Sequence, residues 1–161
     1  MTKATQTNNT DEWLTPDCVL RGLGCFDLDP CAHPAHRTRC AAQGYCLPEE
    51  NGLLLPWSGR VWLNAPFGRE LPKWINRMAL HNNGVMIGAA RVETEWFRVG
   101  WQTAQAVLFP YGRVYYLHSD LTPRKDVPFP SAIMAFGAAN VEALHRLRSS
   151  LPGALLERWR A

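Results

Sequence analysis

The spacing of hydrophobic residues predicts helices in four parts of the chain. These segments are residues 15–24, 70–80, 93–104 and 140–151. The pattern is clearest in the second segment, where Leu71, Trp74, Ile75 and Met78 follow the i, i+3, i+4, i+7 spacing that places side chains on one helix face. This helix is therefore expected to pack one apolar face against a sheet.

Capping residues predict where two of these helices begin. Thr15 is the expected N-cap of the first helix, with Pro16 at the first helical position, and Gly22 or Gly24 is expected to end it. Asn140 is the expected cap of the last helix, because its side chain can accept a hydrogen bond from a free backbone N–H.

Short apolar runs between the helices predict β-strands. These runs are residues 25–32, 60–66, 84–90, 106–110, 113–118 and 131–137. Residues 32–57 are rich in Gly, Pro and small side chains, which predicts mostly loop with one short helix. Strands alternating with helices and closed by a strand pair predict a compact α/β fold of Rossmann-like type, with a mixed sheet and antiparallel edge strands.

Length and composition favour one folded unit. The chain has 161 residues and 47% hydrophobic content, enough for one core, so we expect a single domain at 11–161 after a flexible arm at 1–10. The sequence shows no signal peptide and no apolar run of about 20 residues, so no membrane contact and a cytoplasmic location are expected. The net charge of +3 is compatible with a polyanionic partner but does not establish one.

Cysteine and histidine side chains are dense near the amino-terminal strand. They are Cys25, Cys31, His33, His36, Cys40 and Cys46. Such a group raises the hypothesis of a structural zinc site, but it lacks the C-x-x-C pair typical of zinc ligands. Buried free thiols are the favoured alternative, so no metal is assigned.

The stretch "NAPFG" interrupts the chain between a predicted strand and a predicted helix. Ligands in open α/β sheets bind beyond the carboxyl ends of strands, which is where this stretch lies. Asn64 offers a side-chain acceptor, Pro66 stiffens the turn so that the carbonyl before it points outward, and Phe67 offers a flat face for stacking. Two acceptors and a stacking face suit a planar amine, such as the exocyclic amine of a flipped base.

A purely structural interpretation of this stretch is also open. Asn64 could cap the following helix and Phe67 could be a hydrophobic anchor of a strand-to-helix turn. If the stretch does bind a planar amine for methylation, the target could also be cytosine N4 or the side-chain amide of a protein glutamine, since each is a planar amine or amide.

Several motifs in one order resemble the phage-type Dam-like DNA N6-adenine methyltransferases. They are "DEWLTP" (11–16), "FDLDPCA" (26–32), "NGLLLPWSGRVWLNAPFGRELPKWINR" (51–77), "ETEWF" (93–97), "GRVYY" (112–116) and "FPSAIMAFG" (129–137). The resemblance implies methyl transfer from S-adenosylmethionine to the N6 amine of adenine in DNA. If the protein is phage-encoded, its location is the host cytoplasm.

The resemblance also implies roles for individual residues. Asn64, Ala65, Pro66 and Phe67 take the positions of the catalytic Asn/Asp-Pro-Pro-Tyr/Phe motif, with Ala65 departing from its usual Pro. The residues expected to bind S-adenosylmethionine are Trp13, Thr15, Pro16, Asp29, Pro30 and Cys31. Those expected to contact the base or DNA are Arg69, Arg91, Trp96, Arg124 and Lys125.

Two further expectations concern specificity and activity. Little chain is left over for a separate target-recognition domain, so we expect a short or relaxed recognition sequence read by loops 33–57 and 118–128. The alternative function is a catalytically inactive DNA-binding phage accessory protein that keeps the fold and is stabilised by zinc, for which Ala65 is the best argument.

Overall fold

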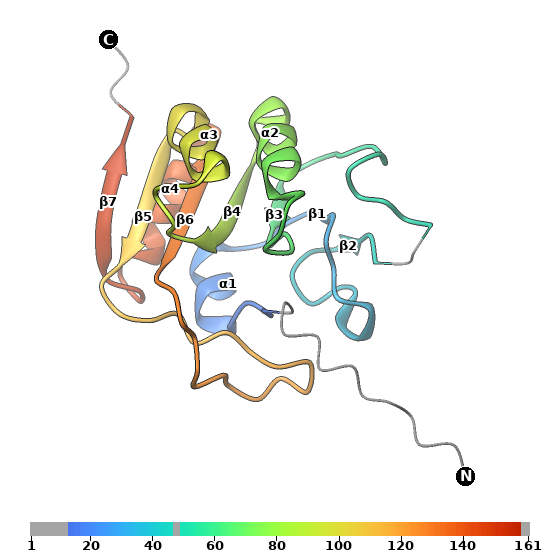
Figure 1. Cartoon of the computed structure of the whole chain (residues 1–161), viewed down its shortest axis with the longest axis horizontal. Coiled ribbons are helices and arrows are strands. Elements are labelled where there is room, and N and C mark those ends of the chain that lie inside the picture. Colours follow the sequence, from blue (N-terminus) through green and yellow to red (C-terminus); the bar gives the residue numbers. More distant parts are fainter. Residues whose placement is uncertain (1–12, 47–48, 159–161) are drawn as a thin grey trace.

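A computed structural model describes residues 13–46 and 49–158 (Figure 1). The helices in these residues are α1 (Asp17–Leu23), the 3-10 helix η1 (Pro34–His36), α2 (Leu71–His81), α3 (Glu95–Thr103) and α4 (Ala138–Leu147). The strands are β1 (Leu28–Asp29), β2 (Gln43–Gly44), β3 (Val61–Leu63), β4 (Gly84–Ala89), β5 (Ala106–Pro110), β6 (Ser131–Phe136) and β7 (Gly153–Glu157). The arm predicted at residues 1–10 lies outside the described residues.

The strands form one mixed sheet in the order β2-β1-β3-β4-β6-β5-β7. The first four strands in this order are parallel to one another, with Leu28 opposite Val61 and Trp62 opposite Val85. Strand β6 runs antiparallel to both of its neighbours, β4 and β5, and β7 runs antiparallel to β5 at the edge. The mixed α/β architecture is confirmed, although one antiparallel strand is internal and the β2 edge is parallel.

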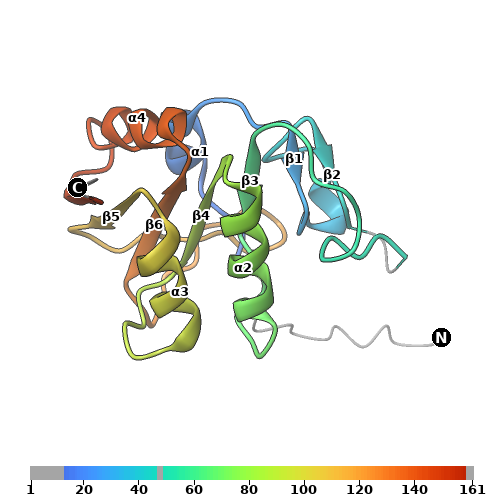
Figure 2. The same cartoon turned by 90° about the horizontal axis from the view of Figure 1, so that it is seen from above.

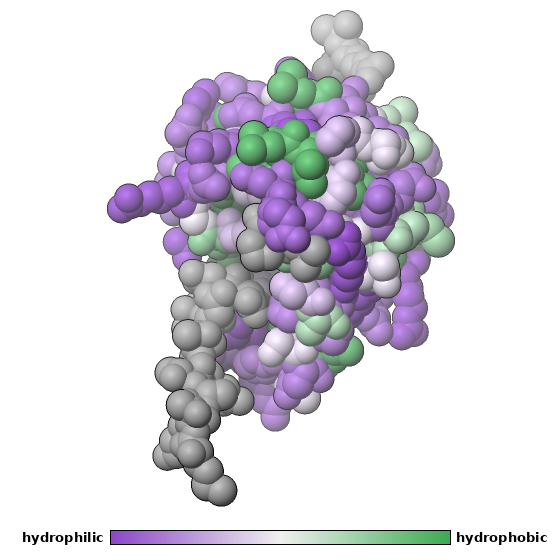
Figure 3. Space-filling view, turned by 90° about the vertical axis from the view of Figure 1, so that its right-hand side faces the viewer, coloured by the Kyte–Doolittle hydropathy of each residue, from purple (hydrophilic) through white to green (hydrophobic). Residues whose placement is uncertain are grey.

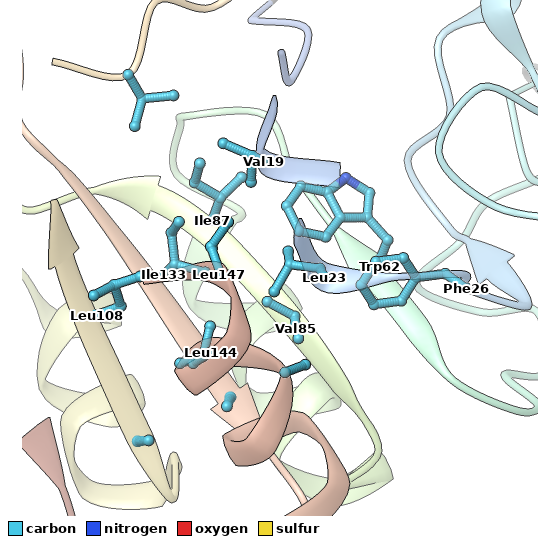
Figure 4. Close-up of a cluster of buried hydrophobic side chains, with 14 of the residues drawn as sticks. Val19, Leu23, Phe26, Trp62, Val85, Ile87, Leu108, Ile133, Leu144 and Leu147 are labelled. Atoms are coloured by element: carbon cyan, nitrogen blue, oxygen red, sulfur yellow. The ribbon is translucent and has the colours of Figure 1, made fainter. Parts of the chain in front are cut away.

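Helices cover both faces of the sheet. Helices α1 and α4 lie on one face, and α2 and α3 lie on the other (Figure 2). On the first face Leu23 of α1 and Leu144 of α4 pack over Val85 and Ile133 of the sheet, beside Trp62 (Figure 4). The second face buries the apolar side of α2, as the sequence pattern predicts. The buried residues of this helix are Leu71, Trp74, Ile75 and Met78.

Two predictions about strands are wrong. Residues 113–118 form no regular strand, and only Leu117 makes isolated bridges, to Leu14 and Pro123. The alternation there is real, because Val114 and Tyr116 are buried, but packing rather than a neighbouring strand buries them. Residues 106–110 and 113–118 therefore do not form the strand pair expected to close the sheet, and β5 pairs with β6 and β7 instead.

Two predictions about caps are also wrong. The N-cap residue of α1 is Pro16 rather than Thr15, and no side chain among the described residues caps this helix. Gly137 precedes α4, with φ of 89°, and Asn140 lies inside the helix. The buried Asn140 amide donates to the Phe136 carbonyl at 2.7 Å and accepts from Arg60 Nε at 2.7 Å, so it joins α4 to the sheet instead of capping it.

The molecular surface on the side of β1 and β2 is mainly hydrophilic, with hydrophobic residues in separate patches (Figure 3). Among the described residues, no helix has the length and hydropathy required to cross a bilayer.

Candidate active site

The carboxyl ends of three adjacent parallel strands bring distant residues to one edge of the sheet. Asp29 is the last residue of β1, Asn64 follows β3, and Ala89 ends β4. These strands are neighbours in the order β1-β3-β4, so their ends lie side by side. The long connection 111–130 lies at the same edge, drawn in yellow and orange in Figure 1. Sequence position alone predicted this gathering of polar groups beyond the strands.

A cavity of about 220 Å³, here called the Asp29 cavity, lies at this edge. It is lined by Trp13, Leu14, Thr15, Asp29, Cys31, Ala32, His33, Pro34, His36, Arg39, Cys40, Trp62, Asn64, Ala65 and Pro66. Four of the six residues predicted to bind the cofactor are among them, together with three of the four predicted catalytic residues. Pro16 and Pro30 do not line it.

The Asp29 carboxyl group is buried in this cavity wall. Only 5% of the residue is exposed, and the Cys31 backbone N–H donates to its Oδ1 at 3.0 Å. Burial raises the pKa of Asp29 to about 7, although the bonds from Cys31 N–H and the Cys40 side chain lower it in part. Asp29 is therefore held as a hydrogen-bonding group whose charge changes near neutral pH.

The neighbouring thiols remain protonated at neutral pH. Burial and then the Asp29 charge raise the pKa of Cys40 to about 12, and the same causes raise the pKa of Cys31 well above its usual value. Within residues 13–46 and 49–158, no three His, Cys, Asp or Glu side chains form a group that could hold a metal ion.

The Asn64 side chain is anchored through its nitrogen. Nδ2 donates to the Thr15 hydroxyl at 3.2 Å and to the Trp13 carbonyl oxygen. Helix α2 begins at Leu71 with Glu70 as its N-cap residue, and no described side chain, Asn64 included, caps it, so the interpretation of Asn64 as a helix cap is wrong. The amide instead joins the end of β3 to the segment before α1.

A second cavity, of about 340 Å³ and here called the Phe67 cavity, lies on the other side of the same loop. Its lining residues are Trp13, Phe67, Gly68, Leu71, Ala89, Arg91, Thr94, Trp96, Pro128 and Phe129. The half-buried Phe67 ring meets the Phe129 ring edge to face, with centroids 5.2 Å apart. Arg91 and Trp96, both predicted to contact the base or DNA, line this cavity.

The remaining predicted DNA contacts lie outside both cavities. Arg69 and Lys125 are exposed. Arg124 has a side chain only 11% exposed, with its guanidinium carbon 3.9 Å from the centre of the Trp13 ring. Trp96 and Phe97 are both buried, and their rings are in edge contact, so Phe97 belongs to the core.

Sequence reasoning predicted His33, His36 and Cys40 only as hypothetical zinc ligands, and it missed Arg39 and Trp62 as lining residues. His33, His36, Arg39 and Cys40 come from the loop that precedes β2, and Trp62 comes from β3. The buried indole Nε1 of Trp62 has no hydrogen-bond partner among the described residues. An aromatic residue two positions before the Asn64 motif, on a strand that ends at the site, was the available signal for Trp62.

Comparison with known protein families agrees with this geometry. A family model described as DNA N-6-adenine-methyltransferase (Dam) matches residues 2–145, which is most of the chain. No curated protein and no solved structure matches. The matched region includes both cavities and the whole Asn64–Phe67 loop. The chain therefore belongs to the Dam family of DNA N6-adenine methyltransferases.

Proposed function

We propose that the protein transfers a methyl group from S-adenosylmethionine to the N6 amine of adenine in DNA. One observation carries this proposal: the Asn64–Phe67 loop lies between two cavities. Asn64, Ala65 and Pro66 line the Asp29 cavity, whereas Phe67 lines the Phe67 cavity, and Trp13 lines both. A methyl donor in the first cavity and a flipped base in the second would meet at this loop.

The Asp29 cavity offers groups that fit S-adenosylmethionine, a cationic molecule with ribose hydroxyls, an ammonium group and an adenine ring. Asp29 supplies an acceptor, Trp13 supplies an aromatic surface, and Trp62 supplies a buried N–H donor that has no partner in the described part of the chain. A buried donor without a partner costs about 1–3 kcal/mol, which an acceptor on a ligand would offset. We assign cofactor binding to Asp29, Trp13 and Cys31, within the Rossmann-like fold expected from the sequence, whereas the Thr15 hydroxyl accepts a hydrogen bond from Asn64 Nδ2.

Methyl transfer requires a nucleophilic amine, and adenine N6 is a poor one because its lone pair is delocalised into the ring. When bound, S-adenosylmethionine supplies a methyl group attached to a positively charged sulfur. The sulfur keeps both electrons of the sulfur–methyl bond when the methyl group is transferred. The Asn64 side-chain oxygen and the Ala65 carbonyl accept hydrogen bonds from the two N6 hydrogens and so make the lone pair more available. The proton that the amine loses passes to solvent.

The Phe67 cavity suits a base withdrawn from the helix. Phe67 offers a ring for stacking, and Trp13, Trp96 and Phe129 complete an aromatic wall. Arg91, exposed at this cavity, is placed to contact the DNA backbone. Loops 33–57 and 118–128 meet where His36 Nε2–H donates to the Ser119 carbonyl at 2.7 Å, and we assign a short or relaxed recognition sequence to them.

Incubation with tritium-labelled S-adenosylmethionine and unmethylated duplex DNA tests this function. We expect label in DNA with the wild-type protein and none with Asn64→Ala, provided that the variant is folded by circular dichroism. An Asn64→Ala protein with wild-type turnover would remove Asn64 from the reaction. Family membership does not favour the inactive accessory protein, which would incorporate no label even with wild-type sequence.

A further inference from the structure

The contact between Thr15 and Asn64 joins residues that are far apart in the sequence. Thr15 is only 1% exposed, and its hydroxyl accepts from Asn64 Nδ2 at 3.2 Å. Thr15 does not perform the capping role expected from the sequence, because Pro16 is the N-cap residue of α1 and no side chain within residues 13–46 and 49–158 caps this helix. The hydroxyl is instead used at the catalytic motif.

The two acceptors beside Asn64 fix which end of its amide faces them. A backbone carbonyl such as that of Trp13 can only accept, so the amide nitrogen must face it rather than the amide oxygen. In this arrangement the Thr15 hydroxyl, which could also donate, accepts from the same nitrogen and adds a second hydrogen bond to it. The amide oxygen is then on the opposite side of the group, where it is available as an acceptor.

The segment that carries these acceptors is itself held firmly. Leu14 N–H donates to the Leu117 carbonyl at 3.2 Å, and Leu117 N–H donates to the Leu14 carbonyl at 2.8 Å. The Trp13 ring contacts Arg124, whose guanidinium carbon is 3.9 Å from the ring centre, and Phe129, whose ring centroid is 5.0 Å away. The acceptors therefore come from a backbone with little freedom to follow the Asn64 side chain.

We infer that Thr15 is a positioning residue, which holds the Asn64 amide so that its oxygen faces the amine to be methylated. This inference rests on the proposed function. Without the hydroxyl, the Asn64 side chain keeps one acceptor and can rotate away from the productive arrangement. A group that acts only through Asn64 affects the turnover step more than it affects the affinity for either substrate.

Thr15→Val and Thr15→Ser form a matched pair for the test. Valine keeps the shape of threonine and removes the hydroxyl, whereas serine keeps the hydroxyl. We expect Thr15→Val to lower kcat by on the order of tenfold, the effect of losing one neutral hydrogen bond, with KM for DNA and Kd for S-adenosylmethionine changed by less than about threefold. Thr15→Ser should restore kcat to within about twofold of wild type.

A second readout does not depend on activity. In ¹⁵N-labelled protein, the side-chain amide signals of Asn64, assigned by their loss in Asn64→Ala, should shift in Thr15→Val and keep their position in Thr15→Ser. Active wild-type protein with unchanged kcat and unchanged amide signals in Thr15→Val would overturn the inference alone. A Thr15→Val protein with weakened cofactor binding and unchanged kcat at saturation would also overturn it. A wild-type protein that transfers no methyl group would overturn the proposed function itself.

Discussion

The guanidinium carbon of Arg124 lies 3.9 Å from the centre of the Trp13 ring, and the Arg124 side chain is 11% exposed. The cation thus covers the residue that lines both cavities. Its neighbour Lys125 is exposed. Two adjacent basic residues, both expected from the sequence to contact DNA, therefore occupy different environments.

This difference predicts different effects of Arg124→Ala and Lys125→Ala. Removing a largely buried cation from an aromatic ring should lower the free energy of unfolding by about 1–2 kcal/mol. Removing Lys125 should leave stability unchanged. It should make the negative slope of log affinity for DNA against log salt concentration shallower by about 0.9, the share of one phosphate contact. Urea titrations and DNA binding at several salt concentrations measure both effects. If the two substitutions changed the free energy of unfolding and the salt dependence of DNA binding equally, the packing role of Arg124 and the DNA contact of Lys125 would be contradicted.

The buried carboxyl group of Asp29 predicts a specific dependence of stability on pH. Its folded pKa of about 7 lies above its usual value of 3.8, so between these values the folded protein holds a proton that the unfolded chain has lost. The contribution of Asp29 to stability therefore falls as pH rises through this range, by up to about 1.4 kcal/mol for each pH unit.

Asp29→Asn should remove this dependence. We expect the unfolding free energy of the variant to gain on that of wild type from about pH 4 to about pH 7 and to keep a constant difference above, because the other titrations are common to both proteins. Urea unfolding at each pH gives the difference. A difference that stays flat across the range would show that the carboxyl titrates normally.

Calorimetry of Asp29→Asn should also show roughly tenfold weaker binding of S-adenosylmethionine than wild type, since a charge-assisted bond is lost.

Ala65 departs from the Pro of the family pattern and is buried, with 2% of the residue exposed. We expect Ala65→Pro to retain or raise kcat, because Pro stiffens the loop by an effect worth about 0.4–1 kcal/mol. Ala65→Gly is the matched control and should lower kcat, because glycine adds backbone freedom. Turnover assays paired with thermal melts distinguish the cases. A folded Ala65→Pro protein without activity would show that this loop differs in conformation from the family's.

The sequence predicted most of the local structure of this fold. The apolar runs of β4 and β6 and the amphipathic pattern of α2 lie where expected, because their burial follows directly from the period of the pattern. Residues 113–118 show the limit of this reasoning. Val114 and Tyr116 alternate with exposed residues as in a strand. Tyr116 is nevertheless buried by contacts with the Trp13 and Phe129 rings, and its hydroxyl is hydrogen-bonded to Ser131.

The candidate site was predicted in part for a similar reason. Asp29 and Asn64 follow strands, so their position at the carboxyl edge could be expected from topology alone. The bonds from Asn64 to Thr15 and the Trp13 carbonyl could not, because they join segments whose approach depends on the whole fold. The same holds for Arg124, whose packing over Trp13 is set by the connection between β5 and β6.

Nucleoside mass spectrometry of the reaction product tests directly whether adenine N6 in DNA is the amine that is methylated. Unmethylated duplex DNA is incubated with the protein and S-adenosylmethionine carrying a deuterated methyl group, and then digested to nucleosides. We expect deuterated N6-methyldeoxyadenosine with wild type and none with Asn64→Ala. Labelled N4-methyldeoxycytidine in its place, or label on added protein instead of DNA, would contradict the assignment of adenine N6 as the amine that Asn64 and Ala65 hold.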